Sequence, residues 1–229
     1  MTGFPDDPAR AAAVAVARQR IEPGMTIGLG SGRAVFALID LLATTWPGPR
    51  PLRAVAASSR TEARARAAGI ELVGLDDDRT LDLAVDGADE VDPDLHLLKG
   101  GGGALLREKL VIAAARHVVI VAESPKLVPR LGTTKALPVE VVRFAWPSTR
   151  TRLLDLLPAA TLRRTPEGDP VVTDEGHHLL DCDLPDTDLP TLATALKSTL
   201  GVVEHGLFLD QADEAFLGHP DGTVQTLAR

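Results

Sequence analysis

The sequence is poor in cysteine and in aromatic residues, and each shortage excludes a class of protein. Cys182 is the single cysteine among 229 residues, which rules out an intrachain disulfide and a metal site built from several thiolates. Aromatic residues make up 3% of the chain, so stacking surfaces for single-stranded nucleic acid are not expected. The net charge of −8 at pH 7 also argues against a polyanionic partner such as DNA. We therefore expect no nucleic acid among the partners.

Long apolar runs and leader-like segments are also missing. No run reaches membrane-spanning length, and residues 1–7 carry Pro5, Asp6 and Asp7 where a signal peptide would be basic and apolar. The six histidines show neither i, i+4 pairing nor a carboxylate at ligand spacing. We therefore expect a cytoplasmic protein with no membrane partner and no metal site.

What the chain has instead is a regular alternation of apolar strands and helical segments. Strands are expected at residues 25–27, 53–57, 70–75, 81–85 and 118–122. Helices are expected at residues 11–21, 35–42, 61–68 and 104–115. Continuous apolar strands that alternate with helices predict an α/β fold with a doubly wound, mostly parallel sheet.

The pattern changes from Thr133 onward. Strands are expected at residues 137–144, 161–164 and 202–204, a hairpin from 171–173 to 179–184, and helices at 148–157 and 189–200. A helix, a hairpin and a second helix between strands suit a small α+β, ferredoxin-like domain with an antiparallel sheet. We therefore expect residues 133–204 to form this smaller domain, and residues 1–132 and 205–229 to form the main domain.

The residues best suited to chemistry lie between positions 81 and 109. An apolar strand ends in the acidic cluster DGADE at residues 86–90, and Lys99 then precedes four consecutive glycines. Ligands of open α/β sheets bind beyond the carboxyl ends of the strands, and a glycine-rich turn into a helix offers free N–H groups to anions. We therefore expect the acids, the lysine and an anion cradle to meet at one place.

Glu108 is the best candidate for a carboxylate in poorly solvated surroundings. Arg107, Glu108 and Lys109 are the only polar residues between Ala104 and Ala115, and three consecutive helical residues point in three directions. The neighbours of Glu108 one turn away are all apolar, so its pKa can be raised toward neutrality for proton transfer. A plain salt bridge to Arg107, Lys109 or Lys99 stays open as the alternative.

A second glycine-rich turn, GLGSG at residues 28–32, lies between an expected strand and an expected helix. A tight turn fits this motif about as well as a phosphate site, because a lone Gly-x-Gly-x-Gly is a weak signal. The turns that begin at Gly28, Ser58, Asp86 and Glu123 would share one carboxyl edge, which places Lys126 within reach of the same crevice.

Seven motifs occur in the order found in one known family. They are GLGSG (28–32), SSRTEARARAAGI (58–70), DGADE (86–90), KGGGGALLREK (99–109), LPVEVV (137–142), TDEG (173–176) and GVVEHGLF (201–208). In these motifs the chain resembles the type A ribose-5-phosphate isomerases nearly from end to end.

The resemblance implies a fold and an activity. The fold would be a Rossmann-like main domain with a smaller, lid-like domain, assembled as a homodimer or homotetramer. The activity would be an aldose–ketose isomerisation of ribose 5-phosphate and ribulose 5-phosphate through an enediol, in the pentose phosphate pathway. The resemblance implies no metal and no cofactor, and a small sugar phosphate as the partner.

Matching positions also imply residue roles. Glu108 would be the base that moves a proton between C1 and C2, Asp86 would assist ring opening, and Lys99 and Asp89 would hold the oxygens on which charge changes. The substrate-binding positions would be Ser31, Gly32, Arg33, Ala34, Gly87, Ala88, Gly100, Gly101, Gly102 and Lys126. Proton abstraction beside a carbonyl needs a poised carboxylate and a preorganised donor, and the chain offers both.

One loop departs from the family pattern, because Arg33 and Ala34 follow Gly32 where two hydroxyl residues usually stand. Arg33 either replaces these donors with a bidentate phosphate contact or is a solvated residue at a helix start.

Other functions also stay open. A sugar-phosphate-binding regulator would carry a basic helix-turn-helix segment, which the residues before Ala11 do not contain. An amino-sugar-phosphate deaminase would need a histidine near the acidic cluster, and only His96 is close to it in sequence. A CoA transferase would need a nucleophilic glutamate in a different loop.

Overall fold

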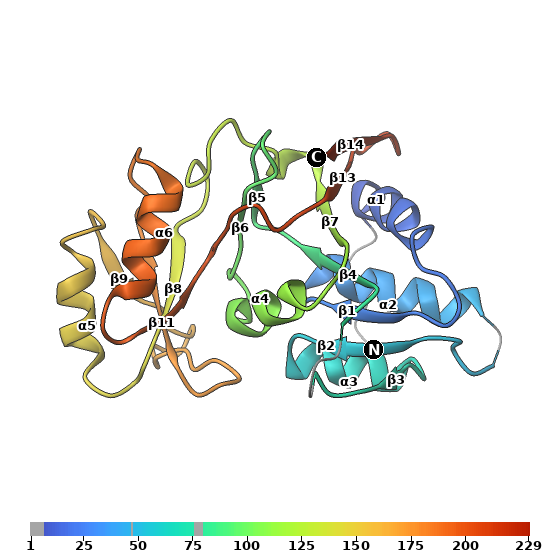
Figure 1. Cartoon of the computed structure of the whole chain (residues 1–229), viewed down its shortest axis with the longest axis horizontal. Coiled ribbons are helices and arrows are strands. Elements are labelled where there is room, and N and C mark those ends of the chain that lie inside the picture. The colour runs from blue at the N-terminus through green and yellow to red at the C-terminus, as the bar shows by residue number, and fades with distance from the viewer. Residues whose placement is uncertain (1–6, 47, 76–79) are drawn as a thin grey trace.

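The main body of the protein is a seven-stranded sheet (Figure 1), and the computed structural model describes residues 7–46, 48–75 and 80–229. Its strands are β1 (Thr26–Leu29), β2 (Arg53–Ala56), β3 (Glu71–Leu72), β4 (Leu83–Gly87), β7 (Val118–Glu123), β13 (Glu214–Gly218) and β14 (Val224–Ala228). The strand order is β14-β13-β7-β4-β1-β2-β3, and only the pairing of β13 with β14 is antiparallel. The predicted mostly parallel sheet is therefore confirmed.

Helices and a small sheet cover the two faces of this sheet. On one face, α1 (Pro8–Arg18), α2 (Arg33–Thr45) and α3 (Ser59–Ala67) pack against strand residues that include Ile27, Val85 and Phe216. On the other face, α4 (Leu105–Ala113) packs beside the three short strands β5 (Glu90–Val91), β6 (Leu97–Leu98) and β12 (Leu207–Phe208). The main sheet is thus the middle layer, and its central strands β1, β4 and β7 are buried from both sides, whereas the edge strands β3 and β14 are partly exposed.

A second, four-stranded sheet has its own hydrophobic core. It consists of β8 (Leu137–Val141), β9 (Ala160–Leu162), β10 (His178–Cys182) and β11 (Val202–His205), and its helices are α5 (Trp146–Leu153) and α6 (Leu189–Ser198). The order β11-β8-β10-β9 is antiparallel throughout, and the chain order β-α-β-β-α-β is that of a ferredoxin-like unit. The predicted small α+β sheet is therefore confirmed.

Some local predictions differ from the structure. Residues 171–173 form no regular strand, since only Val172 makes a bridge, to His178. The strands β5 and β6 were not expected, because two-residue strands leave no periodic pattern. The last segment returns to the main sheet as expected, with β13 between β7 and β14. Residues 1–6, on which the prediction of no signal peptide rests, lie outside the described residues.

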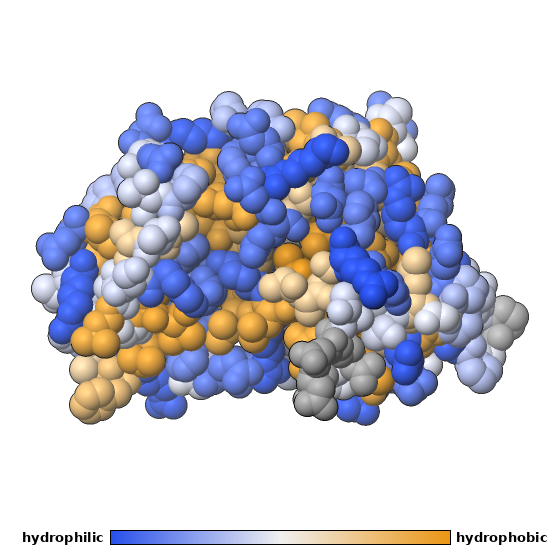
Figure 2. All heavy atoms as spheres, in the orientation of Figure 1, coloured by the Kyte–Doolittle hydropathy of each residue, from blue (hydrophilic) through white to orange (hydrophobic). Residues whose placement is uncertain are grey.

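The surface is mixed in polarity, with exposed apolar side chains at one end. Phe144, which follows β8, is 90% exposed, and Leu200, which follows α6, is 76% exposed. Figure 2 shows hydrophobic residues gathered over the end of the molecule that carries the small sheet. Across the part of the chain that the structure describes, no helix has both the length and the apolar character needed to cross a membrane.

Candidate active site

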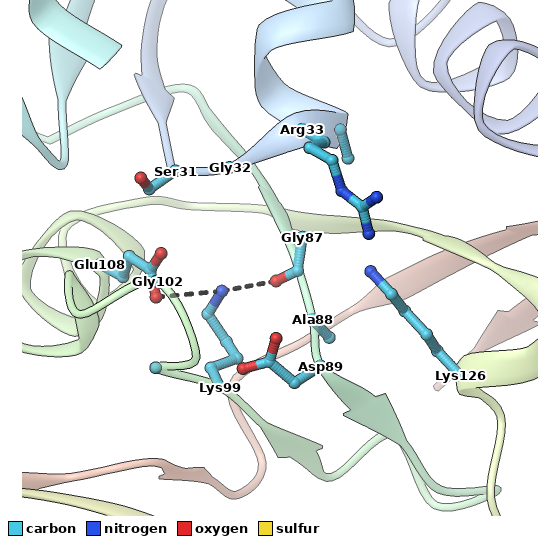
Figure 3. A pocket seen from close by; sticks show the side chains of 12 residues that line it. Ser31, Gly32, Arg33, Gly87, Ala88, Asp89, Lys99, Gly102, Glu108 and Lys126 are labelled. Atoms are coloured by element: carbon cyan, nitrogen blue, oxygen red, sulfur yellow. Dashed lines mark hydrogen bonds and ion pairs between the residues drawn. The ribbon is translucent and has the colours of Figure 1, made fainter. Parts of the chain in front are cut away.

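A cavity of about 210 Å³ opens at the carboxyl ends of β1 and β4 (Figure 3). Its walls come from the start of α2, the end of β4, the glycine loop before α4, α4 itself and the short 3-10 helix η1 (Ser124–Lys126). The lining residues are Ser31, Gly32, Arg33, Ala34, Gly87, Ala88, Asp89, Lys99, Gly100, Gly102, Glu108 and Lys126. The position agrees with the rule that open α/β sheets bind ligands beyond the carboxyl ends of their strands.

Asp86 lies beneath the cavity wall and is almost fully buried. Its Oδ1 atom accepts hydrogen bonds from the backbone N–H groups of Ser31, at 3.1 Å, and Gly87, at 2.7 Å. Gly30 makes room for this carboxylate, because a Cβ atom at Gly30 would lie 1.9 Å from the Asp86 Cγ atom. The glycine-rich turn after β1 and the acidic end of β4 are therefore packed as one unit.

Lys99 sits between two carboxylates. Its Nζ atom lies 3.0 Å from Asp86 Oδ2 and 3.2 Å from Glu108 Oε2, and it also donates to the carbonyl of Gly87. Burial alone would lower the pKa of Lys99, but the charges of Asp86 and then Glu108 raise it above its usual value. Lys99 therefore remains a fixed ammonium group at the cavity wall.

Glu108 stands in the first turn of α4 and is 6% exposed. Burial, followed by the negative charge of Asp86, raises the pKa of Glu108 to about 8, while the Lys99 ammonium opposes this rise. Glu108 thus lies at salt-bridge distance from Lys99, and its raised pKa keeps a large share of the carboxyl groups protonated near neutral pH. Its partner is Lys99, whereas Arg107 and Lys109 pair with other residues.

The glycine loop lies across the cavity from β4. The N–H of Gly101 donates to Asp89 Oδ2 at 2.7 Å, and a Cβ atom at Gly101 would lie 2.9 Å from that carboxylate. Gly102 lines the cavity, and no described atom lies within 4 Å of the place where its Cβ would be. The loop thus brings backbone to a place where side chains would obstruct a ligand.

A cationic end of the cavity is formed by Arg33 and Lys126. Figure 3 shows the two side chains reaching toward each other from α2 and η1. Gly32 is the N-cap of α2 with φ 90°, and no described side chain caps this helix start, so its N–H groups and positive dipole end face the cavity. Backbone donors, a guanidinium and an ammonium therefore suit a phosphate group.

Glu123 holds Lys126 in place. Its carboxylate lies 2.9 Å from Lys126 Nζ and 2.8 Å from Arg10 Nε. Burial would raise the pKa of Glu123, but the charge of Lys126 and further hydrogen bonds, including that of Arg10, lower it to about 2. Glu123 therefore stays ionised and fixes the ammonium group near the start of α2.

The structure brings the predicted site residues together. All of them except Asp86 and Gly101 line the cavity, and these two are bonded to Ser31 and Asp89 in its wall. Sequence reasoning did not single out the supporting residues Gly30, Arg10 and Glu123. It also missed Arg163, whose Nη1 atom donates to the carbonyls of Gly100 and Gly101. Gly30 lies within the GLGSG motif and Glu123 ends an apolar strand, whereas nothing in the sequence pattern singles out Arg163.

The expectation that no carboxylate lies at ligand spacing from a histidine is wrong. Asp92, Asp94 and His96 offer ligand atoms within 4.8 Å of one another. Asp92 Oδ1 accepts from the N–H groups of Asp94 and His96, and its Oδ2 lies 3.1 Å from His96 Nδ1, so the chain's own turn already engages this carboxylate.

His96 is not among the residues that line the cavity, which leaves the deaminase alternative without its histidine.

Comparison with known proteins gives consistent results. The family model described as ribose 5-phosphate isomerase A (phosphoriboisomerase A) matches residues 53–222. A ribose-5-phosphate isomerase A from Synechococcus sp. (strain JA-3-3Ab) is 47% identical over 224 residues, which cover 96% of this chain and 97% of that protein. One from Deinococcus radiodurans is 43% identical over 212 residues, which cover 91% of this chain and 92% of that protein.

Solved structures agree with these relatives. The ribose 5-phosphate isomerase from Plasmodium falciparum has a TM-score of 0.90 and 34% identity, with 97% of this chain and 98% of that chain covered. A D-ribose-5-phosphate isomerase in complex with phospho-erythronic acid has a TM-score of 0.90 and 32% identity, with 99% and 100% covered. These comparisons confirm the predicted enzyme class and do not favour the regulator or the deaminase. The chain therefore belongs to the ribose 5-phosphate isomerase A family.

Proposed function

We propose that this protein catalyses the reversible isomerisation of D-ribose 5-phosphate to D-ribulose 5-phosphate through an enediol, within the non-oxidative pentose phosphate pathway. One observation carries the proposal: the buried Glu108 carboxylate, with its pKa raised to about 8, lies 3.2 Å from the Lys99 ammonium at the cavity wall. A base of this pKa is half ionised near pH 8 and still partly ionised at pH 7, and the ammonium beside it stabilises negative charge.

The substrate phosphate would bind at the cationic end of the cavity. Arg33, Lys126 and the free N–H groups at the start of α2 supply donors there, and Glu123 fixes Lys126. Phosphate bound at this end would direct the other end of the sugar toward Glu108 and Lys99. Figure 3 shows these two side chains on the side of the cavity away from Arg33 and Lys126. Ser31, Ala34, Gly87 and the other lining residues would then shape the space between.

Proton transfer would proceed in two steps. Glu108 takes the proton from C2 of the open-chain aldose, the C–H electron pair forms the C1–C2 double bond, and the carbonyl electron pair moves onto O1. Lys99 and loop N–H groups stabilise this negative charge, and the proton of the O2 hydroxyl moves to O1. Glu108 then returns its proton to C1 and the carbonyl forms at C2. Asp86 would assist the preceding ring opening, and Asp89 would, with Lys99, hold the oxygens on which charge changes.

The test is an assay of the purified protein with ribose 5-phosphate, read by formation of the ketose. Glu108→Gln is expected to lower kcat by about 10²- to 10⁴-fold, the range typical of a general base. Glu62→Gln is the matched control, because Glu62 lies on the exposed face of α3 and pairs with Arg66. Unchanged turnover in Glu108→Gln would remove this residue from its role, and binding of the sugar phosphate without turnover in the wild type would favour the regulator.

The wider assignments belong to the same proposal. We place the main domain at residues 1–132 and 205–229 and the small domain at residues 133–204, supported by the separate antiparallel sheet β11-β8-β10-β9 with its helices α5 and α6. We propose a homodimer or homotetramer in the cytoplasm, and the exposed Phe144 and Leu200 side chains support association between copies. Light scattering on the purified protein measures the oligomeric state, and a monomer at working concentration would overturn that part.

A further inference from the structure

Arg163 of the small domain reaches the glycine loop of the proposed active site. It follows β9, and its Nη1 atom donates to the carbonyl oxygens of Gly100, at 2.8 Å, and Gly101, at 3.1 Å. Asp181 on β10 orients the guanidinium, since Arg163 Nε lies 2.9 Å and 3.2 Å from the two Asp181 carboxylate oxygens, and Arg163 Nη2 also donates to Asp181. The Arg163 side chain is 17% exposed, whereas its partner Asp181 is 32% exposed.

Because Arg163 binds these two carbonyl oxygens, the geometry of the peptide group determines where the following N–H groups point. In a trans peptide the carbonyl and the following N–H point in opposite directions, and the described residues contain no cis peptide. The Gly100 carbonyl faces Arg163, and the N–H of Gly101 accordingly points the other way, to Asp89 Oδ2. The Gly101 carbonyl also faces Arg163, so the N–H of Gly102 points away from Arg163, on the side where Gly102 lines the cavity.

The loop has no side chains that could fix these directions by themselves. Residues 100–103 are all glycine, and Gly100 and Gly103 have positive φ angles of 103° and 83°. Glycine backbones sample many conformations, so contacts from outside the loop must select one. Asp89 accepts from the N–H of Gly101, and Arg163 donates to the carbonyls of Gly100 and Gly101. A guanidinium bound to two successive carbonyls also polarises both peptide groups, which strengthens their N–H groups as donors.

We propose that Arg163, oriented by Asp181, is a positioning residue that directs the Gly102 N–H toward the oxygen that becomes negative in the enediolate. The small domain would thus contribute to transition-state stabilisation across the domain boundary. This inference rests on the proposed function. Its competitor is a purely structural role, in which Arg163 only ties the two domains together.

The experiment compares Arg163→Met with Arg107→Met. Arg107 also crosses to the small domain, where its side chain pairs with Glu175 and Asp174, and among the described residues no side-chain hydrogen bond from Arg107 to the glycine loop is found. Both variants lose one cross-domain arginine, so a purely structural role predicts similar effects for both. Steady-state kinetics with ribose 5-phosphate and thermal unfolding are measured for each.

We expect Arg163→Met to lower kcat by about 10- to 100-fold with a KM change of less than about threefold, somewhat below the effect of deleting an oxyanion donor outright. Arg107→Met keeps kcat within about twofold. Arg163→Lys retains the charge but presents one donor group instead of a fork, so its kcat is expected to lie between those of Arg163→Met and the wild type. This variant keeps the test valid even where the methionine variant folds poorly.

Two inhibitors separate positioning from general damage. Phospho-erythronate carries a planar carboxylate anion that resembles the enediolate, whereas inorganic phosphate reports on the cationic end alone. Arg163→Met is expected to weaken phospho-erythronate binding by about as much as it lowers kcat, and to leave the affinity for phosphate unchanged.

Equal weakening of both inhibitors, an equal loss of kcat in Arg107→Met, or wild-type kcat in Arg163→Met would overturn the inference. The wild-type rate tests the proposed isomerase activity by itself. The ratio of each variant's kcat to the wild-type kcat tests the role of Arg163. Failure of the proposed activity is therefore distinguishable from failure of the proposed role of Arg163.

Discussion

Glu108→Gln removes an ionisable group whose proton affinity differs greatly between the folded and the unfolded chain. Burial, with the nearby charge of Asp86, raises the pKa of Glu108 from 4.5 to about 8 in the folded protein, against the opposing effect of Lys99. Glutamine has nearly the same size and shape but takes up no proton in this range. The substitution should therefore change how the free energy of unfolding depends on pH, as well as abolish proton transfer.

The sign and size of this change follow from linkage. Between pH 4.5 and about 8 the folded protein holds a proton on Glu108 that the unfolded chain releases. The free energy of unfolding of the wild type therefore falls as pH rises through this window, by up to about 1.4 kcal/mol per pH unit from this group. Over the whole window the upper limit is about 5 kcal/mol. Glu108→Gln lacks this loss, so its stability relative to the wild type should increase with pH.

Urea unfolding of both proteins between about pH 5 and pH 9 measures this difference, with the free energy taken from the linear extrapolation. Glu123→Gln is the control, because the pKa of Glu123 is shifted in the opposite direction, down to about 2. The stabilisation from Glu123 is complete above its ordinary pKa and is lost only in acid. The difference in free energy of unfolding between the wild type and Glu123→Gln should therefore stay constant from about pH 5 to pH 9. Parallel curves for wild type and Glu108→Gln would refute the reasoning about Glu108.

Three further predictions concern phosphate binding, packing and metal ions. Arg33→Ala should raise KM for ribose 5-phosphate about tenfold or more and lower kcat less, measured by steady-state kinetics; an unchanged KM would mark Arg33 as a solvated residue. Gly30→Ala should lower the free energy of unfolding by about 3 kcal/mol, because the new Cβ atom would lie 1.9 Å from the Asp86 Cγ atom. Gly102→Ala is the control: nothing lies within 4 Å of its new Cβ atom, so the free energy of unfolding should be nearly unchanged. Urea titration measures both variants. EDTA should leave the isomerase rate unchanged, and a loss of activity that added magnesium restores would contradict the expectation of a metal-free reaction.

The candidate site was predictable because its main residues are close in sequence and follow clear boundaries. Asp86 ends an apolar strand, Lys99 precedes the glycines and Glu108 opens a helix, so the topology of a parallel sheet brings all three to one edge. Ionisable residues on an otherwise apolar helix further signalled a buried carboxylate. Such local signals are independent of contacts between distant parts of the chain.

Features that depend on distant contacts could not be predicted. β12 pairs with β6 across more than a hundred positions, and each strand has only two residues, too few for a period to be read. Residues 171–173 have strand-like composition, but Thr173 donates to Glu140, and the adjacent Asp174 accepts from Ser59 of α3. These contacts with other elements decide the conformation, as is usual for short β segments.

The position of β13 has a consequence for synthesis of the protein on the ribosome. β7 is buried along its whole length and pairs with β13, which is made only after the entire small sheet has been translated. Until then the nascent chain presents an apolar strand whose outer N–H and C=O groups have no neighbour, and such edges are prone to wrong pairing. The larger sheet therefore waits for its final strands, and this edge of β7 stays unpaired until residues 214–218 have been synthesised.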